Sequence, residues 1–382
     1  MNSIAVRVFI ALVAVAALCA ANSSKAQKPP VAVTPPLAAA VDKGAKWLAS
    51  VQGADGGWGQ DGGAASNIRQ GERLESSGND VANTAVAALA LMRAGKQYQP
   101  NVERAVAFIL KRVEASPADG LAITNVQGTQ IQRKLGPYID TFLTSMLLAE
   151  LDGTLSKVQN ARIRQGLEKC VAKIERNQKG DGSWNIAGGW APVLGTSMAS
   201  RSLYAAQQKG VKVNEQTVAL AENYTLKALD SSVDGVRSSP SAAKGSAGGI
   251  AGRAEASVVV SSDSAGVGLY QSAQALEQLS RTDKDRAKNA KQIRAIQRQL
   301  SDARFVEGFG SIGGEEFFSY LNVSDSLKRS GGEEWKKWHS QITDKILKLQ
   351  NNDGTWAGHH CITGRVAVTS AAILNLAVNR AN

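Results

Sequence analysis

A turn motif that occurs three times constrains the fold of this chain more than any other feature of its sequence. Each copy has a Gln at the end of a helical pattern, then an Asp-Gly pair, and a Trp two residues after the Gly. The copies cover residues 52–58, 178–184 and 350–356. Glycine permits the left-handed backbone that ends a helix, and the Asp side chain can bond to backbone groups of the turn. The Trp is a large apolar cap for the helix end, with the Gln amide expected within its reach.

Weaker copies of this turn lie in the gaps between the strong ones. They are Asp119-Gly120, Asp234-Gly235 and Gly308-Phe309-Gly310. Self-similarity along a chain is the signature of a repeat architecture, and these turns recur roughly every 60 residues. The series predicts six units, and therefore one continuous domain over residues 37–380.

Two kinds of helical pattern alternate with the turns. The segments before the turns are amphipathic, with apolar residues at helical spacing, as in 37–51, 102–113 and 335–349. The segments after the turns are small and apolar nearly all round, as in 83–91, 140–148, 195–199 and 366–374. A helix that is apolar on every side is buried. One buried and one half-exposed helix per unit predicts two concentric rings of helices, and a closed ring needs no capping repeats.

Two stretches depart from the repeat. Residues 231–264 are rich in Ser, Gly and Ala and are predicted to form a flexible loop. Residues 281–298 are strongly basic and are predicted to form one helix, which Ile293, Ile296 and Leu300 anchor. The apolar content of 43% excludes general disorder. Three cysteines in 382 residues exclude a small disulfide-built scaffold.

The N-terminus has the pattern of a secretory signal peptide. A single Arg precedes an apolar run over residues 8–21, which is shorter than the roughly 18 residues of a membrane span. Cleavage is expected after Ala21 or Ala26, so residues 1–26 form the signal peptide and residues 27–36 a Pro-rich linker. An exported protein without a membrane span follows. In that compartment a disulfide between Cys170 and Cys361 is permitted, although Cys170 lies on an apolar helix stripe typical of a buried thiol.

The Gln…Asp-Gly-x-Trp turns and paired helices resemble the terpenoid cyclase and protein prenyltransferase superfamily. More narrowly, the chain resembles secreted, squalene cyclase-like bacterial proteins with prenyltransferase/squalene-oxidase repeats. The resemblance covers roughly residues 37–378 and implies an all-α fold, an (α/α)6 toroid. It does not imply an activity, because one fold hosts enzymes and non-enzymes.

The catalytic motifs of that superfamily do not carry over to this sequence. The Asp-x-Asp-Asp acid of class II cyclases is absent, since the nearest string, residues 283–286, lacks the final Asp. Aromatic residues, which stabilise carbocations in such cyclases, make up only 5% of the chain. The Asp-x-Cys…His zinc set of prenyltransferases is also absent, because residues 315–320 contain no Cys and the last buried helix begins at Arg365 without a His. Whether the chain is an enzyme stays open, and no cofactor is expected.

Several residues remain as candidates for a site. Asp80 and Asp140, with Asp263, stand near the starts of buried helices, where a carboxylate can act as a general acid or base or simply cap the helix. Candidates for ligand binding are Tyr138, Arg201, Tyr270, Tyr320 and Arg365. A charge such as Arg201 inside an apolar helix must face a cavity or find a partner. His359, His360 and Cys361 are weak candidates for metal ligands, because adjacent side chains usually point in different directions.

The sequence favours a toroid that binds a small-molecule or polymeric ligand, or another protein, without the known catalytic motifs. A divergent enzyme for an isoprenoid-like substrate is one alternative. A lyase or hydrolase of anionic polysaccharide is another, because the net charge of +11 suits a polyanion. Nucleic acid is not expected, since the basic segment lacks interleaved aromatic residues. The lining of the central cavity discriminates between these hypotheses.

Overall fold

The computed structural model describes residues 35–60, 78–184, 192–238, 265–308 and 313–379, which all lie in one compact unit, Val33–Asn382. The predicted signal peptide lies outside the described residues, and so does Asp263. Residues 27–34 of the predicted linker also lie outside the described residues, and its last two residues, Pro35 and Pro36, belong to helix α1 (Pro35–Ser50). Proline is well tolerated in the first turn, where its missing N–H has no helical partner anyway.

The described residues form helices and no strand. An outer set comprises α1 (Pro35–Ser50), α3 (Gln99–Ala115), α6 (Lys157–Arg176), α8 (Glu215–Ser238), α11 (Ala290–Leu300) and α14 (Gly332–Lys348). An inner set comprises α2 (Val81–Ala94), α5 (Ile139–Leu151), α7 (Pro192–Gln208), α9 (Ala265–Leu279), α13 (Gly314–Ser330) and α15 (Arg365–Leu376). Short helices lie between them: η1 (Lys96–Tyr98), α4 (Gln130–Leu135), α10 (Asp283–Lys288) and α12 (Ala303–Val306).

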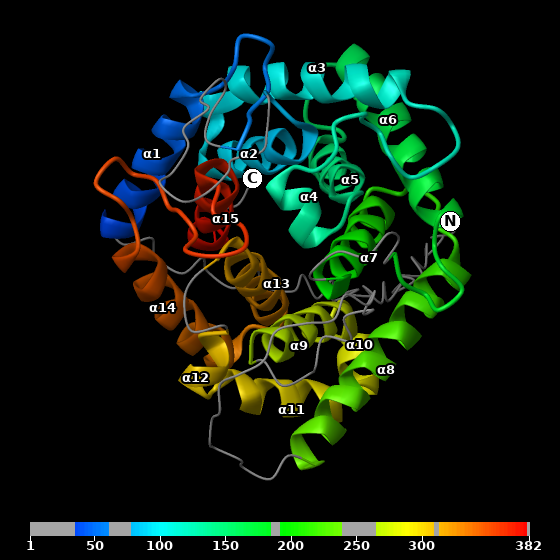
Figure 1. Cartoon of the computed structure of the whole chain (residues 1–382), viewed down its shortest axis with the longest axis vertical. Helices are drawn as coiled ribbons and strands as arrows, with labels where there is room; N and C mark the ends of the chain where they lie inside the picture. The colour runs from blue at the N-terminus through cyan, green and yellow to red at the C-terminus, as the bar shows by residue number, and fades with distance from the viewer. Residues whose placement is uncertain (1–34, 61–77, 185–191, 239–264, 309–312, 380–382) are drawn as a thin grey trace, which may run out of the picture. The chain divides into compact units, whose positions relative to one another are not determined.

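The inner helices form a closed ring (Figure 1). In order, α2 packs on α5, α5 on α7, α7 on α9, α9 on α13, α13 on α15, and α15 returns to α2. The outer helices cover this ring, and α14 contacts α1, so the last unit meets the first in both layers. The prediction of six helical hairpins in two concentric rings is confirmed.

The two layers reflect the two sequence patterns. In α14 the buried residues are Trp335, Trp338, Ile342 and Ile346, spaced three or four apart as one apolar stripe requires. In α2, by contrast, every residue from Val81 to Leu91 is buried. Small Ala side chains make this packing feasible, because they let neighbouring helices approach closely.

The inner helices run in the same direction. At one end, the backbone N–H of Ala82, in the first turn of α2, donates to Asp140 in the first turn of α5. At the other end, Arg93 near the end of α2 pairs with Glu150 near the end of α5, at 3.1 Å. Further round the ring, Tyr270 and Glu316 join the starts of α9 and α13. The inner ring therefore has an N-terminal end and a C-terminal end.

The three strong turns share one geometry. Gly56, Gly182 and Gly354 have φ values of +89°, +91° and +90°, and in each turn the Asp side chain accepts from the backbone two residues later. The Gln amide differs from the expectation, because it donates to the turn glycine and to the neighbouring outer helix rather than reaching the Trp. Gln350, for example, donates to the carbonyls of Gly354 and Ala40 and so ties the last unit to the first.

Some of the weaker copies and departing stretches differ from expectation. Asp234-Gly235 lies inside α8 rather than in a turn, because this helix continues to Ser238, into the predicted loop; residues 239–264 lie outside the described residues. Asp119-Gly120 does form a bend after α3, with Gly120 at φ +70°. The basic segment forms two helices, α10 and α11, because the chain leaves helical geometry at Asn289.

The prediction of a buried thiol at Cys170 is confirmed. The thiol of Cys170 in α6 is fully buried, as the apolar stripe indicated. Cys170 and Cys361, the two cysteines of the described residues, are not joined. No described helix is both long and apolar enough to span a membrane.

Candidate functional site

At the N-terminal end of the ring, two buried carboxylates lie close together. Asp80 precedes α2 and caps it, accepting from the backbone N–H and the side-chain amide of Asn83, both at 2.8 Å. Asp140 accepts from the backbone N–H of Ala82 at 3.1 Å and from the side-chain amide of Gln132 at 2.6 Å. Both acids are about 1% exposed. The capping role expected as the alternative to catalysis is therefore present in the structure.

The pKa values of this pair are high for carboxyl groups. Burial raises the pKa of Asp80 to about 6, against the hydrogen bonds from Asn83 that lower it. Burial, and then the nearby charge of Asp80, raise the pKa of Asp140 to about 7. Below about pH 7 the pair therefore retains protons that an exposed Asp would have lost.

The loop before α15 brings part of the predicted metal cluster together. The donor atoms of His360 and Cys361 lie within 4.8 Å of each other and of a carboxylate oxygen of Glu315, in the first turn of α13. His359 is exposed and does not belong to this group. Sequence reasoning missed Glu315 as a partner, because it lies far from the loop along the chain.

The predicted tyrosines and Arg365 have separate surroundings. The Tyr270 hydroxyl donates to Glu316 at 3.2 Å, and the Tyr320 hydroxyl donates to the Val306 carbonyl at 2.7 Å. Tyr138 lines an open pocket of about 770 Å³ beside the end of α3. Arg365 pairs with Asp353 at 3.1 Å and lies over the Trp47 ring, so it braces the last turn.

A charged cavity opens at the C-terminal end of the ring. Its volume is about 400 Å³, and five inner helices contribute to its lining. The lining side chains are those of Arg93, Ala149, Glu150, Arg201, Tyr204, Ala205, Gln208, Lys209, Glu277, Asp325, Lys328 and Arg329. Arg201 thus satisfies both halves of its prediction, because it faces a cavity and also has partners.

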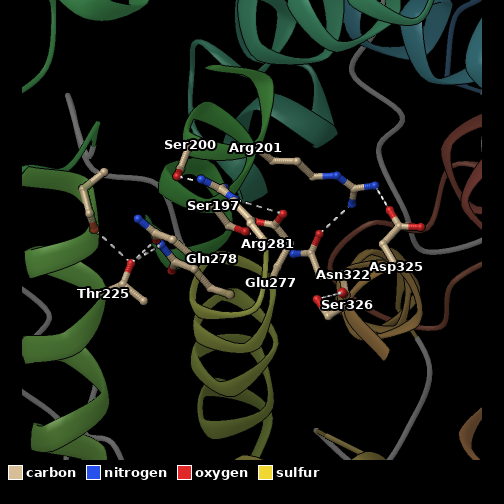
Figure 2. A network of polar contacts seen from close by, with 12 residues as sticks. Ser197, Ser200, Arg201, Thr225, Glu277, Gln278, Arg281, Asn322, Asp325 and Ser326 are labelled. Atoms are coloured by element: carbon tan, nitrogen blue, oxygen red, sulfur yellow. Dashed lines mark hydrogen bonds and ion pairs between the residues drawn. The ribbon is translucent and has the colours of Figure 1, made fainter. Parts of the chain in front are cut away.

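Figure 2 shows how Arg201 reaches from α7 to α13. Its guanidinium donates to Asn322 Oδ1 at 2.8 Å and pairs with the carboxylate of Asp325. Next to Arg201, Arg281 pairs with Glu277 through two guanidinium nitrogens, at 2.7 and 3.2 Å, and donates to the hydroxyl of Ser200. Two arginines and two acids therefore connect α7, α9 and α13 in one polar network.

Glu277 is the centre of this network. Burial alone would raise its pKa, but Arg281, Arg329 and Arg201 together hold the pKa below its ordinary value. Burial lowers the pKa of Arg201 to about 10, with Glu277 acting in the opposite direction. Glu277 is therefore ionised at neutral pH, and it offsets several of the positive charges around the cavity.

Sequence reasoning found Arg201 but not its network. The prediction placed Arg281 only in the basic helix of residues 281–298, whereas its side chain is buried against Glu277. A signal was available, because Glu277 and Arg281 stand four residues apart, the spacing at which helical side chains meet.

Comparison with known proteins gives three similarities. Residues 30–122 match the family model of the squalene-hopene cyclase C-terminal domain. A squalene–hopene cyclase of Bradyrhizobium diazoefficiens is 41% identical over 70 residues, which are 18% of this chain and 10% of that enzyme. A structure of the type II terpene cyclase MstE from Scytonema, in complex with merosterolic acid A, aligns with this chain at 10% identity and a TM-score of 0.41. The alignment covers 90% of this chain and 96% of the MstE chain.

The family-model match falls on residues 30–122, and both sequence matches support the relationship to the terpenoid cyclase superfamily. The aligned stretch spans a tenth of the length of the Bradyrhizobium enzyme. The activity of that enzyme therefore does not transfer with the match.

Proposed function

We propose that the chain is a binding protein whose ring takes a small anionic ligand, bearing carboxylate or phosphate groups, at the C-terminal ends of the inner helices. One observation carries the proposal. The cavity of about 400 Å³ is lined by five cationic side chains, those of Arg93, Arg201, Lys209, Lys328 and Arg329, against three acids, Glu150, Glu277 and Asp325.

The chemistry of this lining suits such a ligand. Cavities of roughly 300–1,000 Å³ are the usual size for small-molecule sites. Guanidinium groups recognise carboxylate and phosphate through paired N–H donors. The low-dielectric walls of a cleft strengthen the attraction between its charges and a ligand.

Lys328 is the cation best placed to meet an incoming anion, and Arg93 lies beside it. Burial, and then the positive charge of Arg93, lower the pKa of Lys328, so an anion between these two groups would relieve their repulsion. Lys328 donates to the Val378 carbonyl, and no acid forms an ion pair with it among the described residues. Arg93, Arg201 and Arg329, by contrast, already contact Glu150, Asp325 and Glu277.

The alternatives differ in what they require of the cavity. A cyclase for an isoprenoid-like substrate needs an apolar, aromatic lining, whereas this lining contains one aromatic side chain, Tyr204. The mixture of Arg, Lys and carboxylates does favour an anionic oligosaccharide as the second candidate. We also infer export, on the apolar run of residues 8–21.

Binding of anions to the full mature chain tests the proposal. Isothermal titration would use pyrophosphate, citrate and trigalacturonate as probes. Lys328→Gln and Arg93→Gln are each expected to weaken the binding of the tightest probe by at least about tenfold, since each removes one charge–charge contact. Lys336→Gln is the matched control, because Lys336 is an exposed residue of α14 that pairs with Glu333.

The outcomes separate the candidates. Tightest binding of pyrophosphate or citrate supports the small-anion site. Binding and cleavage of trigalacturonate alone would replace it with the polysaccharide enzyme. Equal weakening by Lys336→Gln, or no binding of any probe, would overturn the cavity assignment. Appearance of the full-length chain in the exported fraction, lost on deleting residues 2–21, tests the inference about export.

A further inference from the structure

A second cluster of chemistry-bearing side chains lies at the opposite, N-terminal end of the ring. One ligand atom each from Glu315, His360 and Cys361 lies within 4.8 Å of the other two. A carboxylate oxygen, an imidazole nitrogen and a thiol sulfur are all donors that zinc accepts. The anion cavity does not use any of these residues, so the cluster stands apart from the proposed function.

The chain holds the cluster in a defined position. The backbone N–H of Gly314 donates to the carbonyl of Ile362 at 2.9 Å, and the backbone N–H of Ile362 donates to Glu315 Oε2 at 3.1 Å. These two bonds join the first turn of α13 to the loop before α15. Backbone hydrogen bonds therefore hold the segments that carry the three donors in a fixed relative position.

One oxygen of Glu315 has no hydrogen bond of its own. The side chain is completely buried, yet Oε1 lacks a hydrogen-bond partner among the described residues. The Cys361 thiol is close enough to Glu315 for the two groups to affect each other's charge. A buried carboxylate oxygen without a partner is costly, and a bound cation would remove that cost.

The backbone of Cys361 explains how neighbouring side chains can share a site. Its φ is +53°, the one positive value at a non-glycine residue in the described chain. Side chains of adjacent residues usually diverge, but here the donors of both His360 and Cys361 lie near Glu315. Strained backbone of this kind tends to occur at functional sites.

A second layer of contacts orients the histidine. Glu316 Oε1 lies 3.5 Å from His360 Nε2 and accepts from the Tyr270 hydroxyl at 3.2 Å. The other Glu316 oxygen accepts from the backbone N–H of Gly313 at 2.9 Å. A carboxylate behind a histidine is the common outer partner of metal-bound imidazole, because it fixes the ring and raises its basicity.

We propose that Glu315, His360 and Cys361 form a zinc site, with Glu316 as the positioning residue for His360. Zinc prefers four ligands at about 2.0–2.3 Å in a tetrahedron, so the three donors must draw together by a small movement. His360 and Cys361 are partly exposed, which provides a path for the ion and for a water as fourth ligand. With a thiolate, a carboxylate and a neutral imidazole, the ligand charge balances Zn²⁺.

Metal titration of the full mature chain tests this site. We expect one Zn²⁺ per chain, and with Co²⁺ as the probe we expect the thiolate-to-cobalt absorption band and the intense visible bands of a tetrahedral site. Cys361→Ser should abolish the thiolate band. Glu316→Gln should weaken Zn²⁺ binding about 10- to 100-fold while the thiolate band persists.

Controls keep the assignment falsifiable. His359→Ala is the matched variant, because His359 is the exposed neighbour outside the cluster. Unchanged affinity in His359→Ala supports the ligand set, whereas a loss equal to that of His360→Ala would overturn it. Co²⁺ bound to the wild-type chain without a thiolate band would also overturn it, and this measurement needs no variant to fold. The anion titrations are unaffected by either result, so the two proposals fail separately.

Discussion

The indole nitrogen of Trp356 donates a hydrogen bond to the carbonyl of Ile346, ten residues earlier, at 2.7 Å. Trp58 and Trp184 make the same bond to Leu48 and Ile174. The backbone N–H of Trp356 also donates to the hydroxyl of Thr369 in α15, at 2.9 Å. One tryptophan thus joins the end of an outer helix to the inner helix that follows.

Replacing this tryptophan tests the role of the indole bond. Trp356→Phe keeps an aromatic ring but removes the indole donor to the Ile346 carbonyl, which still accepts from the backbone N–H of Leu349. We therefore expect a loss of about 0.5–1.5 kcal/mol in the free energy of unfolding. Guanidinium denaturation provides the measurement. Trp47→Phe is the control, since Trp47 is half-buried; an equal loss there would show that ring size alone matters.

Two glycines with the same backbone angle separate strain from crowding. Gly182 and Gly153 have φ values of +91° and +88°, but a Cβ at Gly182 would lie 2.2 Å from the carbonyl oxygen of Leu220, whereas a Cβ at Gly153 meets nothing within 4 Å. Gly153→Ala should cost about 1–2 kcal/mol from the left-handed backbone alone. Gly182→Ala should cost clearly more, because α8 must move. Equal thermal shifts would contradict this account of the turn.

The buried acids predict a loss of stability as the pH rises. In the unfolded chain Asp140 ionises near 3.8, whereas in the folded chain its pKa is about 7. The folded state therefore holds the extra proton between these values, so the free energy of unfolding falls as the pH rises from 4 to 7 and then levels off. A pKa raised from 3.8 to about 7 corresponds to roughly 4 kcal/mol.

The matching variant is Asp140→Asn, which cannot ionise. Its melting temperature should depend less on pH between 5 and 8 than that of the wild-type chain. Asp344→Asn, in an exposed position of α14, should leave the wild-type profile intact. Parallel profiles for all three chains would mean that the carboxyl pair does not titrate in this range.

Glu277 should have the opposite pH dependence. Its pKa is lowered in the folded chain, so its contribution to stability is complete above the ordinary pKa of a Glu and is lost as the pH falls through the lower, folded value. Glu277→Gln leaves Arg281 and Arg329 without their acid, at a cost of about 3–5 kcal/mol at pH 7. Glu333→Gln, which removes the acid of an exposed ion pair, is the control. It should hardly change the midpoint of unfolding in urea.

The sequence predicted the ring because its turns combine local signals. Asp, Gly and Trp in a fixed order specify a bend, a left-handed residue and a cap within a few positions, and all three roles recur in the structure. The prediction of a turn at Asp234-Gly235 was wrong, because these residues continue the helix α8. Asp119-Gly120 also lacks a Trp after the Gly but does form a bend, so the short Asp-Gly signal alone does not decide between helix and turn.

The arrangement of the site residues was harder to predict from the sequence. The approach of Glu315 to His360 and Cys361, and of Arg201 to Asp325, depends on how helices distant in the chain pack together. No local pattern encodes that distance. Asp80 and Asp140 were found because acids at helix starts are a local signal, although the effect of Asp80 on the pKa of Asp140 was not.

The common direction of the inner helices gives the ring an electrical polarity. Asp80, Asp140, Glu315 and Glu316 stand at the positive ends of the helix dipoles, and Arg93, Lys328 and Arg329 stand at the negative ends. At each end the side-chain charges therefore oppose the helix dipoles and partly cancel them. Because all inner helices point the same way, the ring can gather acids at one end and cations at the other at a lower cost than in the reverse arrangement.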